Sequence, residues 1–225
     1  MRFQDAAKDA RAVVYAGIQA DPLVARTATL LVDATTAERL LARAAMNGER
    51  TDPDTWRRIF PTLFGDGAGE ERKAHAEEVL AASLEIASRG EAARSQYRGA
   101  LVEELTARLL ARRSGPDEPV KRERRVLFDG VRAEIHPYDV TLESVARPEV
   151  YDCKWGARGI NADVLNQLDD ARAHAAEEDA ELRVAIVVFD ARRSCQIRLD
   201  RSTANHEQTR LVALESLDSL KEGRL

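Results

Sequence analysis

The sequence predicts an α/β fold in which a mixed sheet is flanked by helices and is preceded by an all-helical N-terminal domain. Two observations lead to this prediction. Residues 1–96 carry their apolar side chains at helical spacing. From residue 97 onward, a helix is followed by three strand-like segments, a second helix and a continuous apolar run rich in β-branched residues. We therefore expect two domains, 1–96 and 97–225.

In the first half, an alanine-rich helix is predicted from Phe3 to Gln19, and Asp21-Pro22 then ends it and opens another. A further helix start is expected at Thr51-Asp52-Pro53-Asp54, which offers a capping side chain and a proline in the first turn. The alternating glycines of residues 64–69 predict a loop before a long helix over 70–88. No Lys-Ser/Thr pair follows these glycines, so a phosphate loop is not indicated. This half is interpreted as a partner surface, a dimer interface or a DNA clamp.

The second half begins with an amphipathic helix that ends at Ser114-Gly115-Pro116. A strand over 125–128 then meets Asp129-Gly130, a dipeptide typical of tight hairpin turns. The remaining elements are expected in this order: strands over 132–142 and 149–155, a helix from Asn161 or Asp163 to about 178, strands over 183–189 and 195–199, and a polar C-terminal helix.

Composition limits the class of protein. The chain has 225 residues and a formal net charge of −5, which does not suggest a nonspecific coat for nucleic acid. No apolar run is long enough to span a bilayer, and the N-terminus lacks the apolar stretch of a secretory signal. Cys153 and Cys195 form no CxxC pair, so neither a zinc site nor a disulfide framework is expected. We expect a cytoplasmic protein without membrane contact.

A run of basic residues precedes the third predicted strand. It could neutralise backbone phosphates, or it could be a solvated face interleaved with Glu118 and Glu123. The run comprises Arg108, Arg112, Arg113, Lys121, Arg122, Arg124 and Arg125.

Strand alternation identifies the candidate site. Asp152 and Lys154 are two residues apart in a predicted strand and therefore project from the same face, whereas Cys153 points the other way. Asp139, on the neighbouring hairpin strand, can lie alongside Asp152. Two adjacent carboxylates need a cation between them, either Mg²⁺ or Lys154 itself. Glu103, on the preceding helix, could approach the same cluster, and its neighbour Glu104 is the competing choice.

Together these residues resemble the PD-(D/E)xK phosphodiesterase superfamily, whose members have a restriction-endonuclease-like fold. The resemblance covers about residues 97–200. It implies that Glu103, Asp139 and Asp152 bind Mg²⁺ or Mn²⁺, that Lys154 positions the attacking water, and that Gln167 on the following helix supports the site. The plain alternative is that Asp152 and Lys154 form a surface ion pair on an edge strand.

The sequence therefore predicts a metal-dependent endonuclease, with DNA as the expected substrate from the resemblance alone, in restriction, phage defence or repair. The N-terminal helices would contact substrate, a protein partner or a second copy in a homodimer. The alternative is a catalytically inactive nuclease fold that serves as a nucleic-acid-binding or assembly module. In a third hypothesis, the helical half is the functional part and the α/β half is its scaffold.

Overall fold

The computed structural model describes residues 1–6, 10–48, 52–132 and 136–223. It divides into two compact units. The helical unit is Ala10–Leu105, and the α/β unit combines Met1–Asp9 with Thr106–Leu225. The division therefore lies within a helix, nine residues after the predicted boundary at 96, and the N-terminal strand Arg2–Asp5 belongs with the sheet. None of the helices in the described part of the chain is long and apolar enough to cross a membrane.

The helical unit is built from helices whose starts the sequence marks clearly. Asp21 caps the second helix by accepting a hydrogen bond from the Leu23 N–H at 2.8 Å, and Thr35 with Glu38 forms a reciprocal capping box on the third. The helices are α1 (Ala10–Gln19), α2 (Pro22–Val32), α3 (Thr36–Asn47), α4 (Pro53–Ile59), α5 (Pro61–Phe64), α6 (Glu70–Ala87) and α7 (Glu91–Ala111), of which α7 continues into the α/β unit.

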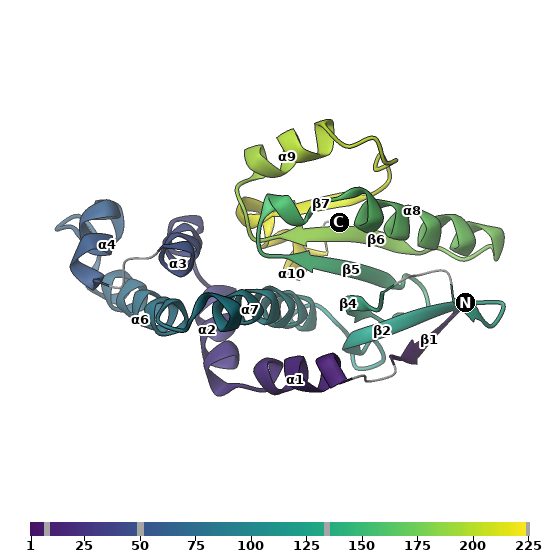
Figure 1. Cartoon of the computed structure of the whole chain (residues 1–225), viewed down its shortest axis with the longest axis horizontal. Coiled ribbons are helices and arrows are strands. Elements are labelled where there is room, and N and C mark those ends of the chain that lie inside the picture. Colours follow the sequence, from purple (N-terminus) through teal and green to yellow (C-terminus); the bar gives the residue numbers. More distant parts are fainter. Residues whose placement is uncertain (7–9, 49–51, 133–135, 224–225) are drawn as a thin grey trace. The chain divides into compact units, whose positions relative to one another are not determined.

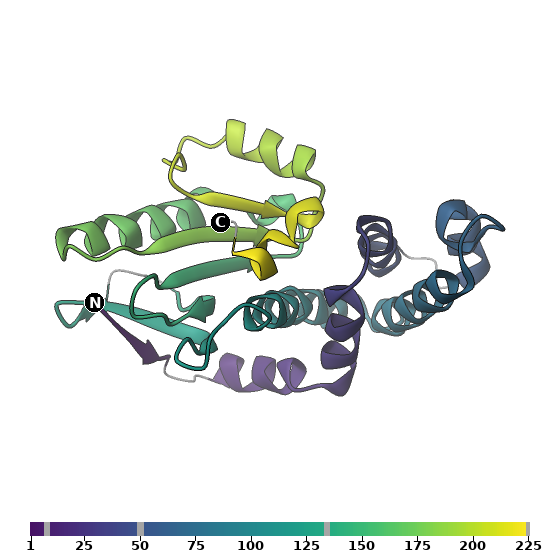
Figure 2. The same cartoon turned by 180° about the vertical axis from the view of Figure 1, so that it is seen from behind.

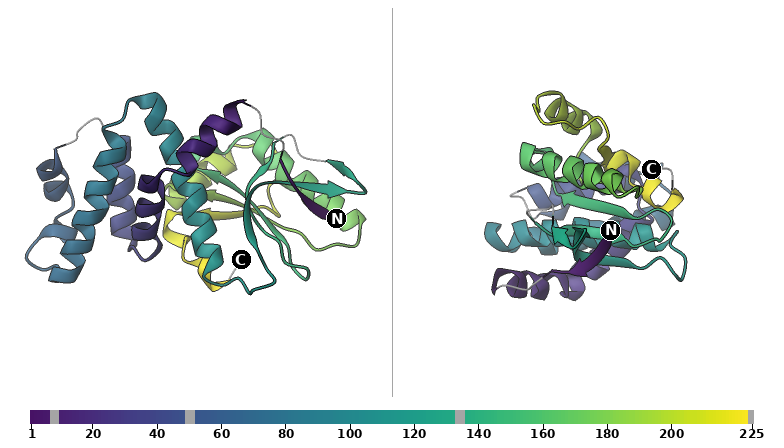
Figure 3. Two further views of the ribbon diagram at one scale, coloured as in Figure 1. Left: turned by 90° about the horizontal axis from the view of Figure 1, so that it is seen from below. Right: turned by 90° about the vertical axis from the view of Figure 1, so that its right-hand side faces the viewer.

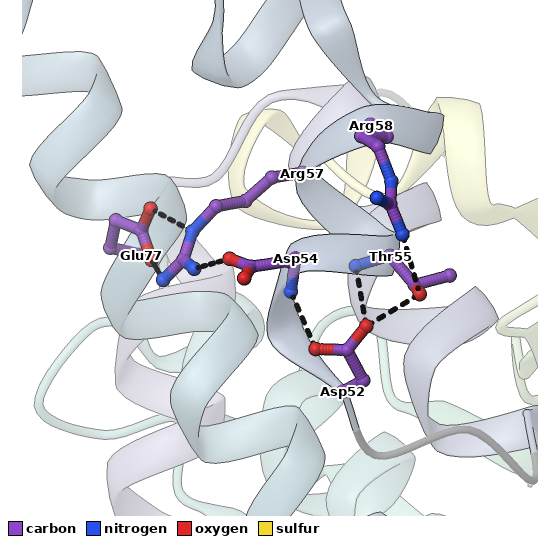
Figure 4. A network of polar contacts seen from close by, with 6 residues as sticks. All are labelled: Asp52, Asp54, Thr55, Arg57, Arg58 and Glu77. Atoms are coloured by element: carbon purple, nitrogen blue, oxygen red, sulfur yellow. Dashed lines mark hydrogen bonds and ion pairs between the residues drawn. The ribbon is translucent and has the colours of Figure 1, made fainter.

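The start of α4 confirms the capping prediction. Asp52 accepts hydrogen bonds from the N–H groups of Asp54 and Thr55, both at 3.1 Å (Figure 4). Arg57 then joins α4 to α6, because its Nε and one terminal nitrogen each lie 2.8 Å from a carboxylate oxygen of Glu77. Such a paired contact fixes geometry as well as charge.

The α/β unit contains a mixed sheet flanked by helices (Figures 1 and 2). Its strand order is β1-β2-β4-β5-β6-β7, with the short β3 paired to the end of β2. Pairing is antiparallel from β1 to β5 and parallel from β5 to β7. The strands are β1 (Arg2–Asp5), β2 (Val120–Phe128), β3 (Val131–Arg132), β4 (Tyr138–Leu142), β5 (Glu149–Lys154), β6 (Arg183–Val188) and β7 (Arg210–Ala213).

Helices pack against this sheet. Alternate residues of β5 and β6, among them Val150 and Ile186, form one core with the apolar side of α8 (Ala162–Glu177). On β5, Cys153 lies 3.5 Å from the hydroxyl of Thr106 in the last turns of α7. The shorter elements are α9 (Arg192–Asp200), α10 (Ser219–Glu222) and the 3₁₀ turns η1 (Ala157–Gly159) and η2 (Leu214–Ser216).

The N-terminal prediction was wrong at its start. Residues Arg2–Asp5 form the edge strand β1 instead of the first turn of a helix, and helix α1 begins only at Ala10 (Figure 3). The strand pairs with β2 across more than a hundred residues of sequence, and Asp5 forms an ion pair with Arg124. Tertiary pairing of this kind overrides local propensity.

The C-terminal prediction was also wrong in part. The segment 195–199 lies in helix α9, where Cys195 and Leu199 are four residues apart and both buried. This spacing puts them on one helix face. The last strand is β7, within the segment expected to be helical, and the terminal helix is only the four residues of α10. A long strand was expected over 132–142. Its described part in the central sheet is β4, which pairs with β2, and residues 133–135 lie outside the described chain.

Candidate functional site

The candidate site lies where β4 separates from β5. Among the described residues, the β4–β5 pairing ends at Val140 opposite Tyr151, while β6 continues to pair with β5 as far as Lys154. The same register places Asp139 opposite Asp152. In place of a further ladder bond, the Asp139 carboxylate accepts a hydrogen bond from the Cys153 N–H at 2.6 Å. A side chain thus satisfies main-chain hydrogen bonding at the point where the strands part.

Lys154 joins the two carboxylates. Its ammonium forms an ion pair with Asp152 and lies 3.8 Å from Asp139 Oδ2. The side chains of Lys154, Asp139 and Asp152 are 26%, 20% and 9% exposed, so the group is partly buried and still reaches solvent. Burial acts to lower the pKa of Lys154, but the charges of Asp139 and Asp152 outweigh it and raise this pKa above its ordinary value. The ammonium therefore remains charged at neutral pH.

The stem of Lys154 is held by the turn that follows β5. A Cβ placed on Gly159 would lie 2.8 Å from both Cγ and Cδ of Lys154, closer than side chains pack. The turn is itself fixed, because the Ala157 N–H donates to Asp190 at 2.9 Å and Arg198 Nε donates to the Ile160 carbonyl at 3.0 Å. Glycine at 159 therefore provides the room in which the lysine stem lies.

A further acid at this place was not anticipated. Glu123 in β2 lies across from Asp139, between the registered pairs Arg122–Val140 and Arg124–Tyr138. One of its carboxylate oxygens is within 4.8 Å of an Asp139 oxygen. Its backbone has φ +52°, a conformation that is uncommon for a residue with a side chain. The sequence carries no signal for this, because Glu123 stands among basic residues and its position depends on the strand register.

Gln167 contacts the main chain ahead of β4. Its amide oxygen accepts from the His136 N–H, and its amide nitrogen donates to the His136 carbonyl, both at 3.1 Å. The side chain is buried on α8. The structure thus gives Gln167 a role in holding the segment three residues before Asp139.

Glu103 belongs to the helical unit, where it is buried on α7. Its carboxylate accepts hydrogen bonds from the Tyr15 hydroxyl at 2.6 Å and from Gln19 Nε2 at 2.7 Å. The neighbouring Glu104 is also buried. Within its unit, Glu103 is therefore fixed by two donors from α1.

Two members of the predicted basic run have structural partners within the α/β unit. Arg113 forms an ion pair with the buried Glu149 and donates to the Leu220 carbonyl at 2.6 Å. Arg124 is buried between Glu143 and Asp5. These two guanidinium groups stabilise the sheet.

Comparison with known proteins gives one finding on the fold. No protein-family model matches this sequence, and no curated protein matches it. The chain is similar in structure to protein VC1899 from Vibrio cholerae, with 16% sequence identity and a TM-score of 0.50. The alignment covers 91% of this chain and 56% of that protein, so this chain spans just over half of its length. At this identity the likeness shows a shared fold and nothing about activity.

Proposed function

We propose that the α/β unit has a restriction-endonuclease-like core and is a metal-dependent nuclease that hydrolyses phosphodiester bonds, with DNA as substrate. The observation that carries the proposal is the group Asp139, Asp152 and Lys154 at the point where β4 leaves β5. Two carboxylates on adjacent strands with an ammonium between them, partly exposed to solvent, supply both a cation site and a charged donor. Phosphodiester hydrolysis requires both.

The acidic residues fit a divalent cation of the Mg²⁺ or Mn²⁺ type. Asp139 and Asp152 offer carboxylate oxygens, the donors that such hard cations prefer, and Glu123 adds a third within reach of Asp139. When bound, the cation would activate a water and offset charge on the phosphate. Glu103 remains in the proposal as an additional carboxylate, because the resemblance implies it.

Lys154 would change partners during this reaction. Without a cation, its ammonium neutralises Asp152. Once the charge of Asp152 is offset by a cation, the ammonium can donate instead to the attacking water and hold the negative charge that develops there. In the metal-free protein the two carboxylates raise the pKa of Lys154, so that its side chain is a charged donor there.

Gln167 would position the site without touching the reacting atoms. By binding both main-chain groups of His136, it fixes the entry into β4 and therefore the location of Asp139. This is a positioning role for the residue that the resemblance associates with the site.

The experiment is plasmid cleavage by the purified full chain in Mg²⁺ or Mn²⁺, with EDTA as the blank. We expect cutting by the wild type and a loss of at least about a hundredfold in Lys154→Ala, as for the removal of one transition-state donor. Lys121→Ala is the matched control, because Lys121 is a half-exposed lysine of the same sheet that pairs with Glu143 at 3.5 Å. Equal cutting by wild type and Lys154→Ala would refute the assignment.

A second candidate function rests on the ion pair itself. Because Lys154 already neutralises Asp152, the pair can persist as a structural feature in a nuclease fold without turnover. Such a protein would act as a nucleic-acid-binding or assembly module. It predicts DNA or RNA binding by gel shift, no cleavage of either polymer in any divalent cation, and unchanged binding in Asp152→Asn.

A further inference from the structure

We infer that the α/β unit has a second ligand site, an anion-binding pocket for a phosphate group at the opposite ends of β5 and β6. The pocket is a hollow of about 260 Å³. Its polar lining comes from β5, α8, β6, β7 and the segments that precede β6 and β7: Tyr151, Arg172, Glu181, Arg183, Gln208 and Arg210. This inference does not depend on the nuclease proposal.

The pocket is separate from the acidic group. Arg183 is paired in register with Glu149, the first residue of β5, whereas Lys154 is paired with Val188. Tyr151 is the lining residue of β5, and it lies three residues before Lys154, roughly 10 Å along the strand, with its side chain on the opposite face. A ligand in the pocket therefore cannot touch Lys154, and loss of one site does not imply loss of the other.

The charge of the lining favours an anion. Three arginines, from α8, β6 and β7, line this hollow, against the single acidic residue Glu181. Arg183 is shared between Glu149 at 3.8 Å and Glu181 at 3.5 Å, so it is partly neutralised already. Arg172 is likewise paired with Asp169 at 2.9 Å, outside the lining. The charged residues of the lining itself are three arginines and one glutamate. A lining with several guanidinium groups suits an oxyanion that can accept several hydrogen bonds.

An unsatisfied donor points to the same ligand. A terminal nitrogen of Arg172 donates a hydrogen bond to Asp169 at 2.9 Å, but the buried Nε of Arg172 has no hydrogen-bond partner within the described residues. The buried hydroxyl of Thr209, between two residues that line the hollow, is likewise without a hydrogen-bond partner in the described part of the chain. Buried polar atoms are nearly always satisfied, so such a donor beside a cationic hollow indicates an oxyanion acceptor.

The size and chemistry of the hollow select a phosphate group. Pockets for drug-sized ligands usually have volumes of roughly 300–1,000 Å³, so this one suits a single phosphate group, free or at the end of a larger molecule. Planar guanidinium groups bind phosphate oxygens through paired hydrogen bonds, which a point-like ammonium cannot do. Arg172 and Arg210 come from different elements, α8 and β7, and can approach one phosphate from two sides.

The test is calorimetric titration of the full chain with inorganic phosphate, in EDTA and at constant ionic strength. We expect one saturable site, a Kd raised at least about tenfold in Arg172→Gln and in Arg210→Gln, and no change in Arg193→Gln. Arg193 is the matched control because it is exposed on α9 and does not line the hollow. Thermal unfolding without phosphate identifies a pocket variant that is misfolded. If one of Arg172→Gln and Arg210→Gln is misfolded, the binding of phosphate by the other variant decides the test.

Two further titrations identify the source of the phosphate group. If a 5′-phosphorylated oligonucleotide binds more tightly than its 5′-hydroxyl form, and Arg172→Gln abolishes the difference, the group belongs to a nucleic-acid end. If inorganic phosphate binds as tightly as the phosphorylated oligonucleotide, the site is for the free ion. The inference is overturned if phosphate binding does not saturate, if acetate binds equally well, or if Arg193→Gln weakens binding as much as the two pocket variants do.

Discussion

Removing the ammonium of Lys154 should expose the repulsion between Asp139 and Asp152. The contact of Lys154 Nζ with Asp139 at 3.8 Å corresponds to about 4 kcal/mol of attraction at the effective dielectric constant of a protein, and the contact with Asp152 is closer. Part of this attraction is offset by desolvation. Breaking a buried pair by removing one partner typically costs about 3–5 kcal/mol. We therefore expect Lys154→Met, in metal-free protein, to lose about 3 kcal/mol of unfolding free energy.

The assay is urea denaturation followed by tryptophan fluorescence. The chain has two tryptophans, Trp56 in the helical unit and Trp155 stacked on Phe189 in the α/β unit at a ring distance of 5.0 Å. A Trp56→Phe background makes Trp155 the sole reporter of the α/β unit. The matched control is Lys121→Met, whose exposed pair should contribute less than about 1 kcal/mol.

A double-mutant cycle isolates the repulsion. Asp139→Asn retains an acceptor for the Cys153 N–H, so it changes mainly charge. It should destabilise the wild type, which loses an attraction to Lys154, and stabilise Lys154→Met, which loses a repulsion against Asp152. If Asp139→Asn destabilises both backgrounds equally, or if Lys154→Met costs less than about 1 kcal/mol, then the charges are not coupled as the distances suggest.

Three further perturbations test other parts of the structure by the same urea method. Gly159→Ala should cost about 1–3 kcal/mol, because the new methyl group overlaps the stem of Lys154, and an unchanged midpoint would contradict this. Gln167→Leu should cost about 2–3 kcal/mol by leaving two main-chain groups unpaired; a loss below about 1 kcal/mol would mean that water replaces the amide. The hydrogen bond from the Tyr97 hydroxyl lowers the pKa of Asp21 in the folded protein. The ionised carboxylate therefore contributes its full stabilisation above pH 3.8, the pKa of the unfolded chain, and this contribution is lost as the pH falls through the lower pKa of the folded protein. Asp21→Asn should therefore cost about 1 kcal/mol at pH 7 and progressively less as the pH falls below 3.8, as read from Trp56, and a pH-independent difference would exclude this linkage.

The elements predicted well are those that local chemistry determines. The Asp129-Gly130 turn has positive φ at both residues, 47° and 79°, as a tight hairpin turn requires. The alternation that put Asp152 and Lys154 on one face also holds, because β6 pairs with β5 through both residues and fixes the pleat. In both places the residue types left little choice of conformation.

The elements predicted poorly depend on distant partners. Four residues of β1 are stabilised by pairing with β2, and nothing within Arg2–Asp5 distinguishes a strand from a helix turn. In α9, the apolar residues Cys195 and Leu199 fit a strand period of two as well as a helix period of four. Glu123 was missed for the same reason, since only the β2–β4 register brings it opposite Asp139.

The geometry of β5 explains why the acidic pair forms there and nowhere else along the strand. Before Tyr151, β5 is bonded on both sides and its residues pack in the core. Beyond it, β6 still fixes the main chain of Asp152, while Asp139 is fixed by its own hydrogen bond to the Cys153 N–H. The position of each carboxylate is thus fixed through the backbone, so the distance between the two carboxylates cannot increase much. A positive charge between them is then required for stability, and the ammonium of Lys154 supplies it.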